Sequence, residues 1–393
     1  MLPLTGITAV SLEQAVAAPF ATRQLADLGA RVIKIERPGV GDFARGFDTT
    51  VRGMASHFVW LNRSKESLAL DLKHPEATAI IHRLLDGADV FLQNLAPGAA
   101  ERLRLGKEAL VSRYPRLIIC NISGYGSSGP FRDKKAYDLL VQAEAGLLSV
   151  TGTPETPAKT GISTADIAAG MYAFSGILTA LYQRERTGKG AALEVSMFEA
   201  LGEWMSYPAY FTAYGGKAPP RTGSSHATIA PYGPFRAGDD KLVLLGVQNE
   251  REWARFCAIV LEQPETAEDS RFSGNARRVE HREALHAIID SVFRQLSAEQ
   301  IVTRLEQAQI ANARINSMQE FWEHPQLEAR GRWREVDSPA GPLRAMLPPV
   351  TMDGYEPRMD PIPAVGEHTE QILRSIGYTE EAINHLRAEN AIS

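Results

Sequence analysis

Short apolar runs alternate with helical patterns over the first part of the chain. An apolar run at Gly6–Leu12 is followed by a helical pattern over Ala17–Leu28, which ends at Gly29, and then by RVIKIE at Arg31–Glu36. This order predicts a β–α–β unit. Further predicted elements follow: strands at Ser67–Asp71, Asp89–Gln93 and Leu117–Ser123, and a helix at about Pro75–Leu85. The alternation predicts an α/β fold, a mostly parallel Rossmann-like sheet with helices on both faces.

The longest apolar helical pattern follows Asp166. Residues 167–181 carry apolar side chains on all sides, which predicts a helix that is buried all round. Asp166 would lie in its first turn, where unpaired backbone N–H groups and the helix dipole hold a carboxylate ionised. Two interpretations follow from the residues alone: Asp166, or Ser163 or Thr164 before it, is an N-cap, or Asp166 is a charged nucleophile in a protected place.

A second domain is predicted after a stretch rich in Gly, Pro and Ser. That stretch, residues 215–234, is expected to be a linker that follows a large domain of residues 1–214. Residues 235–325 are expected to form a smaller α+β domain, with a strand at Leu242–Val247 and helices at Glu250–Leu261, Val279–Leu296 and Ala298–Gln309. Proline-rich linkers at 339–349 and 357–363 then lead to an amphipathic segment, Thr369–Asn390.

Composition agrees with a globular, two-domain protein. The chain has 393 residues, of which 44% are hydrophobic and 23% charged. A formal net charge of -5 argues against nucleic acid or an anionic membrane as partner. Cys120 and Cys257 are the only cysteines, too few for a disulfide framework or a metal knuckle, and they fit a reducing cytoplasm. With no signal-peptide pattern and no apolar run of about 20 residues, we expect a soluble, cytoplasmic protein without a metal.

Glycine motifs do not predict a nicotinamide cofactor. The first predicted β–α turn, LEQAVAAP, lacks the dinucleotide fingerprint, so the fold favours a nucleotide-type ligand without indicating NAD. GYGSSG at Gly124–Gly129 matches the fingerprint formally, but the loop-forming sequence PFRDKK follows it instead of a helix. Arg37 directly follows the second strand, where a cation suits a phosphorylated ribose; a solvated surface arginine is the alternative.

Several stretches resemble the class III coenzyme A transferases, a family that includes formyl-CoA and carnitine CoA-transferases and, as a branch, the α-methylacyl-CoA racemases. The stretches that carry the resemblance are LADLGARVIKIERPGVGD (25–42), NRSKESLALDLKHPE (62–76), FLQNLAPGAAERL (91–103), KAYDLLVQAEAGLLSVTG (135–152), the Asp166 stretch and GEHTEQIL (366–373). It covers essentially the whole chain. It implies two interlocked chains in a homodimer, with residues 326–393 returning to the large domain. CoA thioesters are the implied substrates, and no permanently bound cofactor is expected.

The resemblance also assigns residues. The family's nucleophilic aspartate falls on Asp166, which favours the nucleophile over the cap. Family contacts to coenzyme A would fall on Arg37, Leu70, Asn94, Leu95, Ala99, Arg102, Lys135 and Tyr137. Val16 stands where formyl-CoA transferase has a glutamine beside the thioester, so that polar role is absent or passes to Glu13 or Gln14.

Two further departures bear on specificity. The family's run of four glycines is replaced by RTGSSHATIAPYG (221–233), which disfavours formyl or oxalate specificity. The racemase branch has a histidine before its second acid, whereas this chain has Tyr137 before Asp138. A tyrosine titrates near pH ~10 and is a poor base at neutral pH, so racemisation is disfavoured.

The implied reaction is transfer of CoA from an acyl-CoA donor to a free carboxylic acid through an anhydride and an aspartyl-CoA thioester on Asp166. The sequence looks closest to members that handle small dicarboxylates, with succinyl-CoA as donor and itaconate, mesaconate or citramalate as acceptor. Candidate residues for the acid substrate are Phe47, Arg45, Arg52 and His226. The alternatives are an α-methylacyl-CoA racemase and a non-catalytic acyl-CoA-binding protein.

Overall fold

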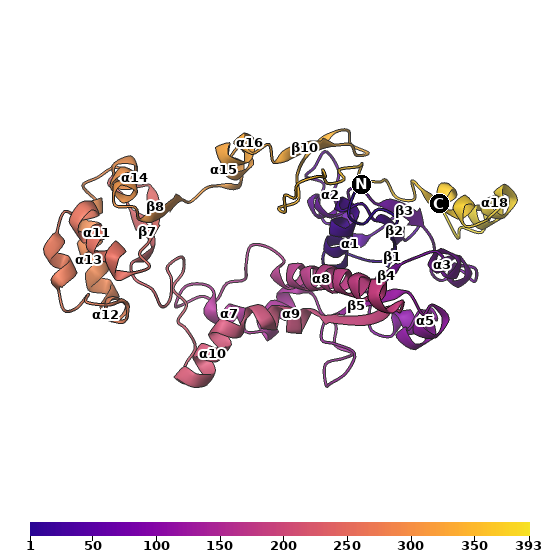
Figure 1. Ribbon diagram of the computed structural model, residues 1–393, viewed down its shortest axis with the longest axis horizontal. Coiled ribbons are helices and arrows are strands. Elements are labelled where there is room, and N and C mark those ends of the chain that lie inside the picture. The colour runs from indigo at the N-terminus through magenta and orange to yellow at the C-terminus, as the bar shows by residue number, and fades with distance from the viewer. The chain divides into compact units, whose positions relative to one another are not determined.

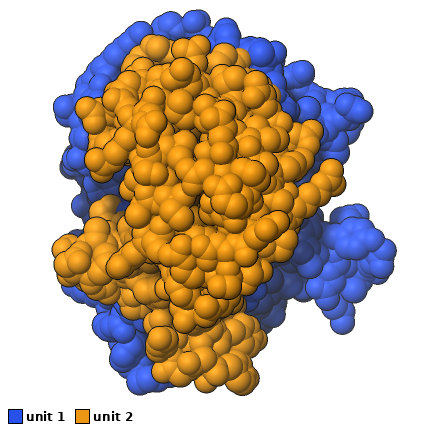
Figure 2. All heavy atoms as spheres, turned by 90° about the vertical axis from the view of Figure 1, so that its left-hand side faces the viewer, with its two compact units in different colours: residues 1–145, 160–205, 327–393 blue, residues 146–159, 206–326 orange.

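The structure is a computed structural model that describes residues 1–393, and the chain divides into two compact units. Unit 1 comprises residues 1–145, 160–205 and 327–393, and unit 2 comprises residues 146–159 and 206–326 (Figure 2). Helix α10 (Ser206–Gly215) therefore belongs to unit 2. The first strand of unit 2, β7 (Tyr232–Arg236), begins within the segment that the sequence suggested as a linker.

Unit 1 is built on a six-stranded, fully parallel sheet with the order β3-β2-β1-β4-β5-β6 (Figure 1). Its strands are β1 (Thr8–Leu12), β2 (Arg31–Glu36), β3 (Glu66–Ala69), β4 (Val90–Gln93), β5 (Ile118–Ser123) and β6 (Ala191–Ser196). The order is that of dinucleotide-binding folds, and it reverses between β1 and β4. The prediction of a Rossmann-like parallel sheet is confirmed, whereas β6 was not predicted. The residues of β6 are mostly half-buried at the sheet edge, so they lack the continuous apolar run of the central strands.

Both faces of this sheet are covered, because neighbouring strand residues point to opposite sides. On β1, Ala9 belongs to one core cluster and Val10 to the other. The first cluster packs against α1 (Ala17–Asp27), α6 (Asp138–Glu144), α8 (Thr164–Thr187) and α9 (Met197–Trp204). The second packs against α3 (Ala77–Leu85), α5 (Lys107–Arg113), α17 (Thr369–Ser375) and α18 (Glu380–Ala388). Unit 1 is thus a three-layer α/β/α structure.

Helix α8 is the helix predicted after Asp166, and it ends at Gly188 in a left-handed conformation. It lies close against α1: a Cβ added at Gly170 would stand 2.6 Å from the carbonyl oxygen of Ala17. Burial all round is wrong for the single chain, because Met171, Tyr172 and Tyr182 are exposed on one face. By length and composition alone α8 could cross a membrane, but core helices share these properties.

The last part of the chain completes unit 1 at the β3 edge of the sheet. The side chain of Thr369 accepts the backbone N–H of Ala69, and Leu70 forms a bridge with Ile392. A two-stranded antiparallel sheet, β10 (Trp333–Val336) and β11 (Leu343–Met346), precedes this region. The other helices of unit 1 are α2 (Ser56–Leu61), α4 (Ala99–Arg102) and α16 (Pro325–Ala329), of which α16 begins just before the unit boundary.

Unit 2 has a three-stranded antiparallel sheet with the order β7-β8-β9, where β8 is Leu242–Gly246 and β9 is Ala311–Arg314. Its helices are α7 (Leu147–Val150), α10, α11 (Glu250–Arg255), α12 (Asn275–Glu280), α13 (Arg282–Phe293), α14 (Ala298–Gln307) and α15 (Met318–Trp322). An apolar cluster that includes Trp253, Phe272 and Phe293 fills its core. Strand β8 and helix α14 lie where the sequence predicted them.

Candidate active site

A pocket of about 940 Å³ opens in unit 1 at the carboxyl ends of the parallel strands. The loops that follow β1, β4 and β5 line it, together with the start of α8. The strand order reverses between β1 and β4, and ligands of open α/β sheets bind at this point. The fold therefore places a small-molecule site where Asp166 lies.

Asp166 lies in the first turn of α8 and lines this pocket, half-buried. The backbone N–H of Ala17, the first residue of α1, favours the charged form of its carboxylate, and Ala17 lines the same pocket. Burial, followed by the negative charge of Asp138, raises the pKa of Asp166 to about 7, while the Ala17 N–H acts in the opposite direction. The expectation that the start of its own helix holds Asp166 ionised is therefore wrong, because burial and a neighbouring carboxylate outweigh the donor.

Asp138, the first residue of α6, takes the role of helix cap for α8. Its Oδ1 accepts the backbone N–H groups of Ala165 at 2.8 Å and Asp166 at 3.2 Å. Ser163 precedes the helix without a side-chain cap bond. The interpretation of Asp166 or Ser163 as the cap is thus wrong, since a residue from another helix supplies the acceptor, and the Asp166 carboxylate remains available to the pocket.

The loop between β1 and α1 forms one wall of the pocket through Gln14. Asn94 holds the backbone of Gln14 from both sides, because its Oδ1 accepts the N–H at 2.8 Å and its Nδ2 donates to the carbonyl oxygen at 2.9 Å. The side chain of Gln14 accepts the N–H of Phe43 through Oε1, and both residues line the pocket. Val16 is buried and is not part of the lining, and Glu13 is fully buried among cations. Of the two alternatives to Val16, only Gln14 reaches the pocket.

Cationic side chains collect along the same pocket. Lys107, Arg132, Lys134 and Lys135 line it, and Lys134 forms an ion pair with Glu144. Lys107 and Lys135 form no ion pair, so both can meet anionic groups such as phosphates. Lys107 was missed by the sequence analysis. Its signal was a lysine at the first position of α5, where the helix dipole disfavours a cation.

The residues assigned from the family resemblance fall into two groups. The pocket lining includes Asp166, Asn94, Leu95, Lys135 and Tyr137. Outside the lining lie Arg37, exposed after β2; Ala99, at the start of α4; Arg102, exposed on α4; Leu70, buried in the core; and Val16. Ala99 stands between Gly98 and Ala100, which do line the pocket.

The residues suggested for the acid substrate have other partners. Arg45 donates two hydrogen bonds to Glu36, at 2.9 and 2.8 Å, and its guanidinium lies 3.6 Å from the ring centroid of Phe58. Arg52 donates to the carbonyl oxygen of Pro342. Phe47 is half-exposed with its ring packed edge-on against His57, and His226 belongs to unit 2, where it stacks on Tyr232.

Comparison with known proteins shows the family to which the chain belongs. The family model described as CoA-transferase family III matches residues 4–369. The chain belongs to this family. It is therefore a CoA-transferase that uses an acyl-CoA and a carboxylate.

Three proteins illustrate how similar the relatives of this transferase are. The succinyl-CoA:glutarate CoA-transferase of Homo sapiens is 33% identical, over 99% of this chain and 90% of that protein. The acetyl-CoA:oxalate CoA-transferase of Acetobacter aceti is 35% identical over 90% of both chains. A crystal structure of a CAIB/BAIF family protein from Brucella suis is 30% identical, with a TM-score of 0.83, and the match covers 95% of this chain and 99% of that one.

Proposed function

We propose that this transferase moves CoA from succinyl-CoA to a small dicarboxylate through covalent intermediates on Asp166. The observation that carries the proposal is a carboxylate with a pKa of about 7 in a pocket at the reversal point of the sheet. The two curated relatives described above carry a dicarboxylate, glutarate or oxalate, in their names. Succinyl-CoA as donor is supported by the human relative.

The proposed steps exchange one acyl bond for another without a redox change. The Asp166 carboxylate attacks the thioester carbonyl of the donor, the C–S bond breaks, and CoA leaves as a thiolate, so that a mixed anhydride of succinate and Asp166 remains. The thiolate then attacks the aspartyl carbonyl, which releases succinate and forms an aspartyl-CoA thioester. The acceptor carboxylate then attacks the aspartyl-CoA thioester, which releases the CoA thiolate and forms an anhydride of the acceptor with Asp166. The thiolate attacks the acceptor carbonyl of this anhydride, which yields the new acyl-CoA and free Asp166.

The environment of Asp166 favours such intermediates. Burial penalises the charged carboxylate, whereas the anhydride and the thioester on Asp166 are neutral, so acylation relieves this penalty. The N–H of Ala17 favours the charged carboxylate in the free enzyme and is suited to donate to the developing oxyanion of an acylated Asp166. A carboxylate of raised pKa is also the more basic nucleophile once it has lost its proton.

Unpaired cations support the placement of coenzyme A in the same pocket. Lys107 and Lys135 offer ammonium groups to its phosphates, and Tyr137, which is 66% exposed, offers a large ring surface. Arg45 is not proposed as the partner of the second carboxylate, since Glu36 already neutralises it.

A homodimer with interlocked chains is also part of the proposal, and so is a cytoplasmic location. The support is the exposed apolar face of α8 with Met171, Tyr172 and Tyr182, because exposed aromatic patches of this kind mark protein contacts. Trp204 of α9 is exposed as well. The dimer claim is independent of the chemistry on Asp166.

The test of the proposed function is incubation with succinyl-CoA and single free acids: glutarate, itaconate, mesaconate, citramalate and oxalate. We expect a new acyl-CoA mass with at least one dicarboxylate, and none with Asp166→Asn, which keeps the size of the side chain but removes the nucleophile. Incorporation of solvent deuterium at the α-carbon without any acceptor would instead indicate a racemase. If succinyl-CoA stays unchanged with every acid of the panel, the proposal is contradicted.

A further inference from the structure

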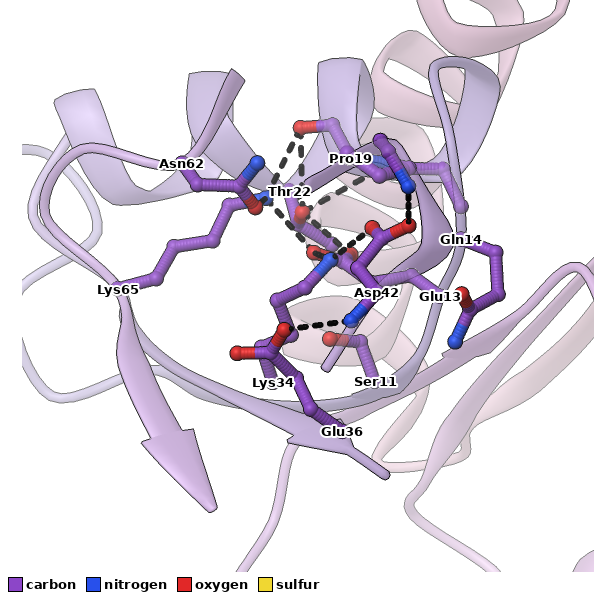
Figure 3. A network of polar contacts seen from close by, with 12 residues as sticks. Ser11, Glu13, Gln14, Pro19, Thr22, Lys34, Glu36, Asp42, Asn62 and Lys65 are labelled. Atoms are coloured by element: carbon purple, nitrogen blue, oxygen red, sulfur yellow. Dashed lines mark hydrogen bonds and ion pairs between the residues drawn. The ribbon is translucent and has the colours of Figure 1, made fainter. Parts of the chain in front are cut away.

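A fully buried network of charged side chains lies beside the active-site loop (Figure 3). Glu13 accepts hydrogen bonds from Lys65 at 2.7 Å, Lys34 at 3.3 Å and the Thr22 hydroxyl at 2.6 Å. Lys34 also donates to Oδ2 of Asp42 at 2.7 Å. None of these side chains lines the pocket, although the adjacent loop does through Gln14 and Ala15. The proposed chemistry uses none of the buried charges.

Asp42 connects this network to the loop between β1 and α1. Its second oxygen, Oδ1, accepts the backbone N–H of Ala15 at 3.1 Å and that of Ala44 at 2.9 Å. Ala15 has a φ of +61°, a left-handed conformation that an alanine adopts at a cost of about 1–2 kcal/mol. Two residues further on, Ala17 lines the pocket together with Asp166, and its N–H favours the charged form of that carboxylate. The loop therefore needs an acceptor that holds Ala15 in an unfavourable conformation, and Asp42 supplies it.

Stability alone is a weak reason for such a network. Removing charges from water costs several kcal/mol per ion, and apolar residues of similar volume often replace buried ion pairs without loss. The Lys34 ammonium binds Oδ2 of Asp42 while Oδ1 accepts the loop N–H, so both carboxylate oxygens are held. An acceptor of fixed orientation next to a strained residue is suited to aim a backbone group.

We propose that Asp42 is a positioning residue for Asp166. By holding Ala15 in its left-handed conformation, Asp42 directs the N–H of Ala17 at the Asp166 carboxylate. This inference rests on the proposed role of Asp166, because the aimed donor matters only if that carboxylate reacts. Without Asp42, Ala15 relaxes to negative φ, the start of α1 shifts, and Asp166 loses the nearby N–H of Ala17, which opposes the rise of its pKa.

The test combines a loss with a rescue. In Asp42→Ala, we expect kcat to fall about ten-fold or more, because a misplaced group at a reacting centre has effects of this size. The acid limb of kcat/KM should move up in pH, while the KM for the donor changes little. Adding Ala15→Gly should recover most of the lost kcat, because glycine adopts positive φ without strain. Ala15→Gly alone should leave the acid limb in place, because glycine keeps the positive φ of this position.

Asp27 offers a matched control at the other end of α1. It is equally buried and is held by Arg63 through two hydrogen bonds of 2.8 Å, yet it does not contact the loop. Asp27→Ala should lower the melting temperature without moving the acid limb. If Asp42→Ala does not fold, Asp42→Asn takes its place. The asparagine keeps the size of the side chain, but its NH2 group cannot accept the hydrogen bond from the Lys34 ammonium.

Carboxyl ¹³C NMR titration separates this inference from the proposed function, since it reads the pKa of Asp166 without turnover, with Asp166→Asn to assign the signal. An upward move of that pKa in Asp42→Ala, reversed in the double variant, is the expected result. The inference is overturned if the pKa and kcat of Asp42→Ala match those of the wild type, or if Ala15→Gly rescues nothing. A wild type that transfers no CoA while the titration behaves as expected would overturn the proposed function only.

Discussion

The charge of Asp138 can be removed while its capping geometry is kept, which makes Asp138→Asn the sharpest probe of the site. The Oδ1 of asparagine can still accept the N–H groups of Ala165 and Asp166. Burial is the larger cause of the rise in the pKa of Asp166 from 3.8 to about 7, and Asp138 is the second. Asp138 is thus the smaller of the two causes that raise the pKa of Asp166, and its removal should lower that pKa by about 1 pH unit, or about 1.4 kcal/mol.

The assay is the pH profile of kcat/KM, because its acid limb reports ionisation in the free enzyme. The wild type should lose activity below about pH 7, where Asp166 becomes protonated. Asp138→Asn should move this midpoint down by about 1 pH unit and raise kcat/KM at pH ~6 several-fold, because more of the enzyme carries the carboxylate. Glu185→Gln, an exposed charge near the far end of α8, is the control and should leave the limb in place. An unmoved or raised midpoint in a folded Asp138→Asn enzyme would refute the reasoning.

Three other outcomes are expected. Lys107→Ala and Lys135→Ala should each raise the KM for the CoA donor about five-fold or more at unchanged kcat, because a remote phosphate contact contributes equally to ground and transition states. A loss confined to kcat would remove the residue from the binding site. Asp166 has a raised pKa in the folded state, so its contribution to stability is complete below the unfolded pKa of about 3.9 and is lost as the pH rises through about 7. The melting temperature of Asp166→Asn relative to the wild type should therefore be higher at pH ~8 than at pH ~5. The opposite order would contradict the raised pKa. Tagged and untagged protein mixed for a day should form no mixed dimers by native mass spectrometry, because interlocked chains exchange only by unfolding, and ready exchange or a folded monomer would rule out interlocking.

The sheet could be predicted because the central strands of a parallel sheet are continuous apolar runs. The predicted range of β2, Arg31–Glu36, agrees with the structure to the residue. Strand β6 escaped because half-buried edge residues do not form such a run, and the small antiparallel strand β9 (Ala311–Arg314) is too polar and short to signal itself. The apolar pattern thus predicted the central strands of the large sheet but not the strands β6 and β9.

The site was predicted less completely because its determinants come from distant parts of the sequence. Asp166 was found through the helix that follows it, yet its pKa depends on Asp138 and on the start of α1. Lys34 lies in an alternating strand, where a lysine is ordinarily assigned to solvent, but it is fully buried against Glu13 and Asp42. The exposed face of α8 could not be predicted either, because a helical pattern of apolar residues does not show whether they pack against the same chain or against another one.

Covalent capture shows directly whether Asp166 is the nucleophile. The protein is incubated with excess succinyl-CoA, treated with hydroxylamine or borohydride during turnover, digested and examined by mass spectrometry next to Asp166→Asn. We predict a modified Asp166 in the wild type, the hydroxamate after hydroxylamine or the alcohol after borohydride, and no modification of this peptide in the variant. An enzyme that transfers CoA at full rate without any such adduct, or an equal adduct in Asp166→Asn, would contradict it.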